Sequence, residues 1–173
     1  MKKVLMLALL ACSLALSAGA AGRDDFTISL SLTIGERGRD SNAATSTIRL
    51  EGNTLAYEQT YSGAGASQRK SARLEFKLRA DEISRLKSLV KEQNLNGTGS
   101  LKFEPAAGQS AYFEMNIKVT LKGVIATQEL YGPRRAANIK DERVYQKSVA
   151  LLRELYRLIN LRDKEIGYQE PVS

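Results

Sequence analysis

The chain has 173 residues, with 26 lysine and arginine residues against 19 acidic ones, one cysteine, and neither histidine nor tryptophan. Its length is sufficient for one domain with its own hydrophobic core. The missing histidine excludes the usual general base of serine and cysteine nucleophiles. Zinc sites built from cysteine and histidine are excluded for the same reason. Carboxylates that bind calcium or magnesium stay compatible with the composition, but no residue pattern indicates a metal site or a cofactor.

The first twenty residues have the three parts of a cleavable secretory signal peptide. Met1–Lys3 is basic, Val4–Leu16 is almost entirely apolar, and the small residues Ala18 and Ala20 fit an Ala-x-Ala cleavage site. The apolar run of about 13 residues is shorter than the roughly 20 that a transmembrane helix needs. We therefore expect residues 1–20 to be removed. The protein is then exported, to the periplasm or the extracellular space, without a transmembrane span.

Cys12 allows a second interpretation of this segment. Leu9–Cys12 resembles the lipobox of bacterial lipoproteins, in which the cysteine is acylated and becomes the new N-terminus. However, the chain stays apolar through Leu16 and then offers its own cleavage site, whereas a lipoprotein usually turns polar soon after its cysteine. An ordinary cleavable signal is favoured, and lipidation at Cys12, giving a lipid-anchored envelope accessory protein, is the alternative.

Cleavage after Ala20 leaves 153 residues, Ala21–Ser173, with no cysteine. No disulfide can then form, so stability depends on packing. The net charge becomes +5, because the signal contains Lys2 and Lys3 but no acid. A moderate positive charge favours attraction to anionic surfaces. It is less than the dense basic footprint of a nucleic-acid-binding domain, and we expect no nucleic-acid partner.

The first half of the remaining chain alternates apolar and polar residues, which predicts strands. Asp25–Ile34 forms the first strand, and Thr45–Tyr61 forms a hairpin around a Gly-Asn turn at residues 52–53. Ala72–Arg79 forms a fourth strand. The turn predicts that the hairpin pairs Leu50 with Leu55 and Ile48 with Tyr57.

The period then changes to that of a helix over Asp81–Gln93, and residues 94–108 are expected to form a loop. A second hairpin follows, from Ala111 to Tyr131, around a turn at residues 122–123. A second helix is predicted over Asp141–Leu161, and residues 163–173 are expected to be a polar, frayed tail. The hairpin register pairs Val119 with Ala126 and Lys118 with Thr127.

This order of elements, ββββ-α-ββ-α, predicts an α+β domain over residues 21–162. We expect an antiparallel sheet of about six strands, with two helices packed on one face.

Two groups of residues are compatible with a histidine-free hydrolase. Three Ser-x-x-Lys matches resemble the serine and lysine of penicillin-recognising enzymes, and several glutamates lie on or beside strands. Three matches in one short chain indicate chance, and the glutamates fall in the solvated phase of the strands, so no catalytic residue is assigned. The matches are Ser67–Lys70, Ser84–Lys87 and Ser88–Lys91, and the glutamates are Glu51, Glu58, Glu75, Glu114 and Glu129.

Four basic residues are predicted to contact an anionic partner, namely Arg134, Arg135, Lys118 and Lys122. The partner is expected to be an acidic protein patch or another anionic component of the envelope. Because the sequence lacks the usual catalytic base, metal ligands and cofactor loops, the leading hypothesis is a non-enzymatic exported domain that binds a protein. A histidine-free hydrolase using carboxylates or a Ser-Lys pair is the alternative, together with the lipid-anchored accessory protein.

Overall fold

The computed structural model of the chain describes residues 25–38, 41–104, 109–135 and 137–172. The proposed signal peptide, with its cleavage residues Ala18 and Ala20 and the lipidation candidate Cys12, lies outside the described residues. Within them, no helix has the length and apolar character that crossing a membrane requires.

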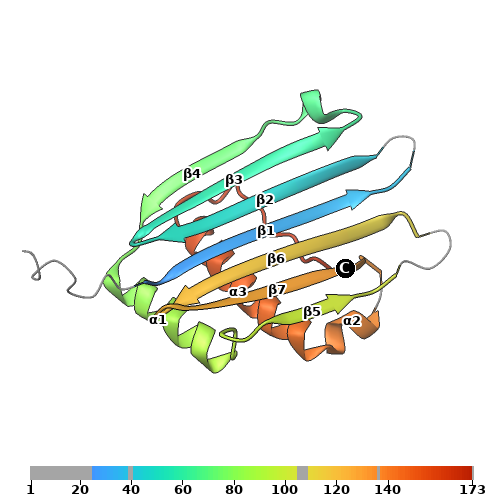
Figure 1. The fold of residues 1–173 in the computed structure, drawn as a ribbon. Coiled ribbons are helices and arrows are strands. Elements are labelled where there is room, and N and C mark those ends of the chain that lie inside the picture. The colour runs from blue at the N-terminus through green and yellow to red at the C-terminus, as the bar shows by residue number, and fades with distance from the viewer. Residues whose placement is uncertain (1–24, 39–40, 105–108, 136, 173) are drawn as a thin grey trace, which may run out of the picture.

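Within the described residues, seven strands form one sheet, and the α-helices lie behind it in the view of Figure 1. The strands are β1 (Thr27–Glu36), β2 (Asn42–Glu51), β3 (Thr54–Gly63), β4 (Ala72–Lys77), β5 (Gly99–Lys102), β6 (Ala111–Leu121) and β7 (Val124–Pro133). The helices are α1 (Ala80–Glu92), α2 (Ala137–Asp141) and α3 (Arg143–Asn160), with a short 3₁₀ turn, η1 (Ala66–Gln68).

The strand order across the sheet is β4-β3-β2-β1-β6-β7-β5. The first strand of the chain therefore lies at the centre, between an N-terminal group of three strands and a C-terminal group of three. All neighbours are antiparallel except β5 and β7, which are parallel.

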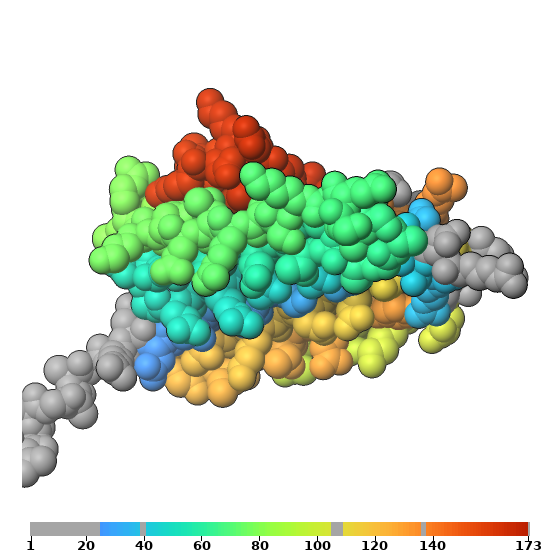
Figure 2. All heavy atoms as spheres, turned by 90° about the horizontal axis from the view of Figure 1, so that it is seen from above, coloured from blue at the N-terminus to red at the C-terminus, as the bar shows by residue number. Residues whose placement is uncertain are grey.

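The alternation along the strands separates a buried face from an open one, as a period of two requires. On β1, the buried side chains Ile28, Leu30 and Leu32 face the helices, and the small polar side chains between them face the opposite side. Helix α3 covers this apolar face with Leu151, Leu155 and other fully buried residues. The core thus lies between the sheet and the helices, and no helix or strand of the described residues covers the other face of the sheet (Figures 1 and 2).

Both predicted hairpins are confirmed, including their registers. Leu50 pairs with Leu55 and Ile48 with Tyr57 around the turn at residues 52–53, where Gly52 has a φ of 61°. In the second hairpin the turn residues Lys122 and Gly123 both have positive φ, which gives the backbone twist that two-residue hairpin turns require. The predicted pairs Val119–Ala126 and Lys118–Thr127 are present.

The prediction of about six antiparallel strands and two helices is correct in class but wrong in these details. Residues 99–102, expected in a loop, form β5, which has four residues and gains its hydrogen bonds from β7. Such a short segment shows no alternation, and its parallel pairing makes the sheet mixed. The helix predicted over Asp141–Leu161 is present as α3 (Arg143–Asn160). The short helix α2 precedes it and was not predicted, and Glu142 separates the two with an extended conformation of φ −69° and ψ 126°.

The C-terminal segment Asp163–Val172, here called the C-terminal strap, packs on the domain, contrary to the expected frayed tail. Ile166 and Val172 are buried, and Val172 donates its backbone N–H to the Tyr145 hydroxyl over 3.2 Å. Arg134 donates from Nε and Nη2 to the carbonyl oxygens of Pro171 and Glu170, at 3.3 and 3.2 Å. Apolar burial and these hydrogen bonds stabilise a segment that looks polar by composition.

Candidate functional site

The uncovered face of the sheet, here called the open face, carries the outward side chains of all seven strands. Its centre is occupied by small hydroxyl side chains of β1, and longer polar side chains project from the neighbouring strands. On β1 these hydroxyl residues are Thr27, Ser29, Ser31 and Thr33. Thr33 Oγ1 lies 3.1 Å from Thr45 Oγ1 on β2, so part of this row is already hydrogen-bonded within the sheet.

The serine and threonine side chains of β1 are shorter than most of the side chains that project from the neighbouring strands. The open face is therefore concave along β1. A shallow groove of about 260 Å³ extends from β1 across β6 to β7. Ser29 and Ser31 on β1 line one side of it, Lys118 and Asn116 on β6 lie in the middle, and Glu129 on β7 lines the other side. Asn116 donates from Nδ2 to Glu114 Oε1 over 3.0 Å. Hydroxyl, amide, ammonium and carboxylate groups therefore line the same groove.

An aromatic and cationic cluster lies at one end of the open face. Tyr112 on β6 and Tyr131 on β7 have ring centroids 6.4 Å apart. The Arg37 guanidinium lies 5.4 Å from both centroids and donates a hydrogen bond to the Tyr131 hydroxyl. Arg37 follows β1 and is exposed, whereas the two tyrosines are half-buried. The cluster presents two rigid rings and one cation to solvent.

Charge on the open face is mixed. Register places Glu58 of β3 opposite Arg73 of β4, and Ser29 of β1 opposite both Arg49 of β2 and Lys118 of β6. Charges of both signs surround the hydroxyl row, and such a surface is electrostatically complementary to another of mixed charge.

The four basic residues predicted to bind an anionic partner are not brought together. Lys118 lies on the open face, but Lys122 lies in the turn at the start of β7 and Arg134 follows its other end. Lys122 and Arg134 are therefore separated by the ten residues of β7, which span about 33 Å. Arg134 is half-buried because it holds the C-terminal strap, and Arg135 beside it is exposed. A shared anion site for these four residues is therefore not supported.

The residues considered for hydrolysis are scattered. Ser67, Ser84 and Ser88 are all exposed, and no hydrogen bond among the described residues joins any of them to its lysine. The strand glutamates are likewise exposed and lie on different strands, namely Glu51, Glu58, Glu75, Glu114 and Glu129. Among the described residues, no three carboxylates, cysteines or histidines are grouped so as to hold a metal ion.

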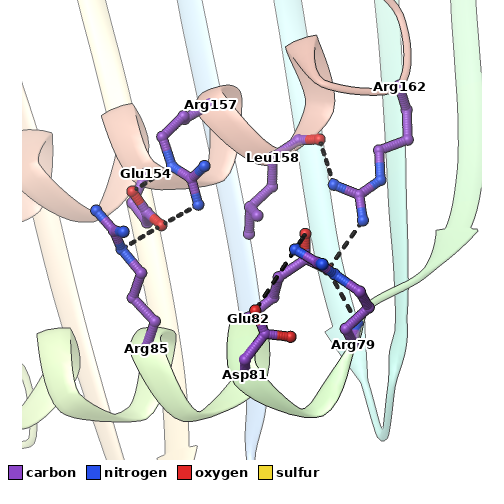
Figure 3. A network of polar contacts seen from close by, with 8 residues as sticks. All are labelled: Arg79, Asp81, Glu82, Arg85, Glu154, Arg157, Leu158 and Arg162. Carbon is purple, nitrogen blue, oxygen red and sulfur yellow. Dashed lines mark hydrogen bonds and ion pairs between the residues drawn. The ribbon is translucent and has the colours of Figure 1, made fainter.

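One buried and one half-buried carboxylate have structural partners between α1 and α3 (Figure 3). Glu82, with 3% of its side chain exposed, accepts hydrogen bonds from Arg162 Nη2 at 2.8 Å and from the Arg79 backbone N–H at 2.9 Å. Burial opposes ionisation of Glu82, but these hydrogen bonds and the positive charges outweigh it and hold the pKa below its usual value. Glu154 joins Arg85 and Arg157 in the same layer, at 2.9 and 2.8 Å. The ion pairs Glu82–Arg162 and Glu154–Arg85 therefore connect α1 with α3 and the residues that follow it.

The open-face cluster was not predicted as a site, although part of its signal was present. Tyr112 falls in the outward phase of its strand, but Arg37 lies in a polar segment and Tyr131 ends a strand more than ninety residues later. Only the pairing of β1 with β6, and of β6 with β7, brings the three side chains together.

No protein-family model matches the chain, and no curated protein shows significant sequence similarity to it.

Proposed function

We propose that this protein is an exported, non-enzymatic domain that binds another protein through the open face of its sheet. The observation that carries the proposal is a wide, uncovered sheet face with the Arg37–Tyr112–Tyr131 cluster at one end. Tyrosine and arginine are enriched in protein interfaces and among the residues that contribute most to binding. Export rests on the predicted cleavable signal in residues 1–20.

The chemistry of the open face resembles that of surfaces selected for protein recognition. Serine, threonine and asparagine side chains offer adaptable hydrogen bonds, and tyrosines offer rigid contact area with little conformational entropy to lose. Here the hydroxyl row of β1 supplies the first property and the Arg37–Tyr112–Tyr131 cluster supplies the second.

The open face is also large enough to form a protein–protein interface. Five adjacent strands, β3, β2, β1, β6 and β7, have ten or eleven residues each. With strands about 4.8 Å apart and about 3.3 Å per residue, they cover on the order of 800 Å². A standard protein–protein interface buries about 800 Å² on each partner. One partner of ordinary size can therefore cover the face.

Site-directed photocrosslinking in the producing cell tests this proposal. A photoreactive amino acid at Thr47, on the open face, should capture one protein reproducibly, and the same group at Ser88, on the exposed surface of α1, should not. The double variant Arg37→Ala/Tyr131→Ala should reduce the Thr47 product at least fivefold without changing the unfolding midpoint by much, because both side chains reach solvent.

Three results would overturn the proposal. Equal capture from Thr47 and Ser88 would show no preference for the open face. Capture only of a second copy of this chain would replace a separate partner with self-association. Hydrolytic turnover that is lost on mutating one glutamate or serine would favour the histidine-free hydrolase instead.

A further inference from the structure

A second concave surface lies on the opposite side of the sheet, beyond the part that the helices cover. It is a cleft of about 430 Å³ at the ends of β1, β2, β3 and β6, beside the C-terminal strap. Its volume falls within the roughly 300 to 1,000 Å³ that is usual for small-molecule sites. Because it opens on the helix side, it is separate from the open face and from the proposed function.

The floor of this cleft is apolar and made of small side chains. Ala44 on β2 and Ala111 on β6 leave space at the strand ends, and Ile34 on β1 lies half-buried between them. Tyr61 on β3 adds an aromatic wall. These side chains suit a short apolar group more than a fully hydrated ion.

Two arginines stand on the rim. Arg69 follows η1, and its guanidinium lies 5.4 Å from the centre of the Tyr61 ring. Among the described residues, no carboxylate lies within ion-pair distance of Arg69. Arg134 is oriented by its hydrogen bonds to the carbonyl oxygens of the C-terminal strap, which fixes its plane at the cleft. The guanidinium of Arg69, which lies beside the Tyr61 ring, is suited to bind a carboxylate.

The remaining polar groups of the cleft set its selectivity. Asn42 and Gln169 offer amides, and Glu36 places one negative charge on the same rim. Among the described residues that line the cleft, Arg69 and Arg134 are cationic and Glu36 is anionic. The negative charge of Glu36 disfavours a second negative charge on the ligand.

We infer that this cleft binds a small organic monocarboxylate with a short apolar chain. The carboxylate contacts Arg69, and the chain lies on Ile34, Ala44 and Ala111. Binding positions the ligand between the strand ends and the C-terminal strap.

Titration of the ¹⁵N-labelled protein, expressed from the full chain, with octanoate tests the inference by NMR. Octanoate should produce saturable shifts at Ala44 and Ala111, and octanamide, which has the same chain without the charge, should bind at least fivefold more weakly. Arg69→Ala should weaken octanoate binding about five- to tenfold, since Arg69 is exposed and its removal leaves the core intact. Glu36→Gln should strengthen it. Arg49→Ala, an exposed arginine on the open face, is the matched control and should have no effect.

Equal binding of octanoate and octanamide would overturn the assignment of a carboxylate site. So would octanoate shifts that are scattered over the surface, or an unchanged affinity in Arg69→Ala with a folded spectrum. None of these results affects crosslinking from Thr47, so failure of this inference and failure of the proposed function are distinguishable.

Discussion

Arg162 contacts the carboxylate of Glu82 at 2.8 Å across eighty residues of sequence. The same guanidinium lies 4.7 Å from the centre of the Phe76 ring on β4 and donates to the Leu158 carbonyl over 3.4 Å. One side chain therefore connects the end of α3 to the start of α1 and to an edge strand of the sheet. Its partner Glu82 is almost fully buried, and loss of the Arg162 charge leaves Glu82 with the more distant guanidinium of Arg79, at 3.4 Å.

Glu82→Ala is expected to lower the free energy of unfolding by about 2 to 3 kcal/mol, less than for a fully buried pair because Arg162 keeps 24% of its side chain exposed. Urea unfolding followed by circular dichroism measures this. Glu75→Ala, an exposed carboxylate on β4, is the control and should change stability by less than about 0.5 kcal/mol. Equal effects of the two variants would contradict the role assigned to Glu82.

The lowered pKa of Glu82 makes stability depend on pH in a defined direction. An unfolded glutamate binds a proton near pH 4.5, whereas the folded group resists protonation to lower pH. The stabilisation is therefore complete above about pH 4.5 and is lost as the pH falls through the folded pKa. Urea unfolding between pH 6 and pH 3 should show a shallower loss for Glu82→Gln than for the unmodified protein. If the free energy of unfolding fell equally with pH in both proteins, the lowered pKa of Glu82 would be contradicted.

Gly63→Ala should destabilise the sheet where β3 ends beside β2. Gly63 has a φ of 95°, and an added Cβ would lie 1.6 Å from the carbonyl oxygen of Ser41. Backbone must move to remove that overlap, so we expect a loss of about 2 kcal/mol or more. Gly97→Ala is the matched control, because a Cβ there meets nothing within 4 Å. Thermal unfolding of the two variants checks the difference, and similar midpoints would refute it.

Val172→Ala tests whether the C-terminal strap contributes to stability. The side chain is fully buried, and two missing carbon atoms should cost about 1 to 2 kcal/mol in unfolding free energy. Gln169→Ala, at an exposed position on the same strap, is the control and should leave the free energy of unfolding nearly unchanged. Urea denaturation that leaves both variants equal to the unmodified protein would show that the strap is not anchored in solution.

Expression of the full chain should yield a protein that begins at Ala21, because Ala18 and Ala20 fit the cleavage pattern. Intact-mass spectrometry checks this. A mass that corresponds to an acylated Cys12 terminus, with incorporation of labelled fatty acid, would establish the lipid-anchored alternative. Recovery of the chain with Met1 attached would contradict export with cleavage.

Much of the fold could be predicted from local patterns. Each hairpin turn places its strands in one register, so pairs such as Leu50–Leu55 follow from the position of the turn. The order of strands across the sheet does not follow, because β1 pairs with β6 through residues that lie 75 (Glu36 and Ala111) to 93 (Thr27 and Thr120) positions apart in the sequence. β5 was missed because Gly99–Lys102 has no periodicity of its own, and β7 supplies its partners.

The candidate sites were harder to predict, for the same reason. Nothing in the sequence indicates that Arg134 donates hydrogen bonds to the C-terminal strap. Ile166 and Val172 are single apolar residues in a polar segment, and such isolated residues carry no pattern. The Arg37–Tyr112–Tyr131 cluster arises from three segments that meet only in the finished sheet.

The central position of β1 has a consequence for synthesis of the chain. β1 to β4 leave the ribosome before β6 exists, so one edge of β1 has unpaired backbone groups and the apolar side chains Ile28, Leu30 and Leu32 have no helix α3 to cover them. A nascent sheet in this state is prone to pair with other chains. These groups stay exposed until the last third of the polypeptide, which contains most of β6 and all of β7 and α3, has been made.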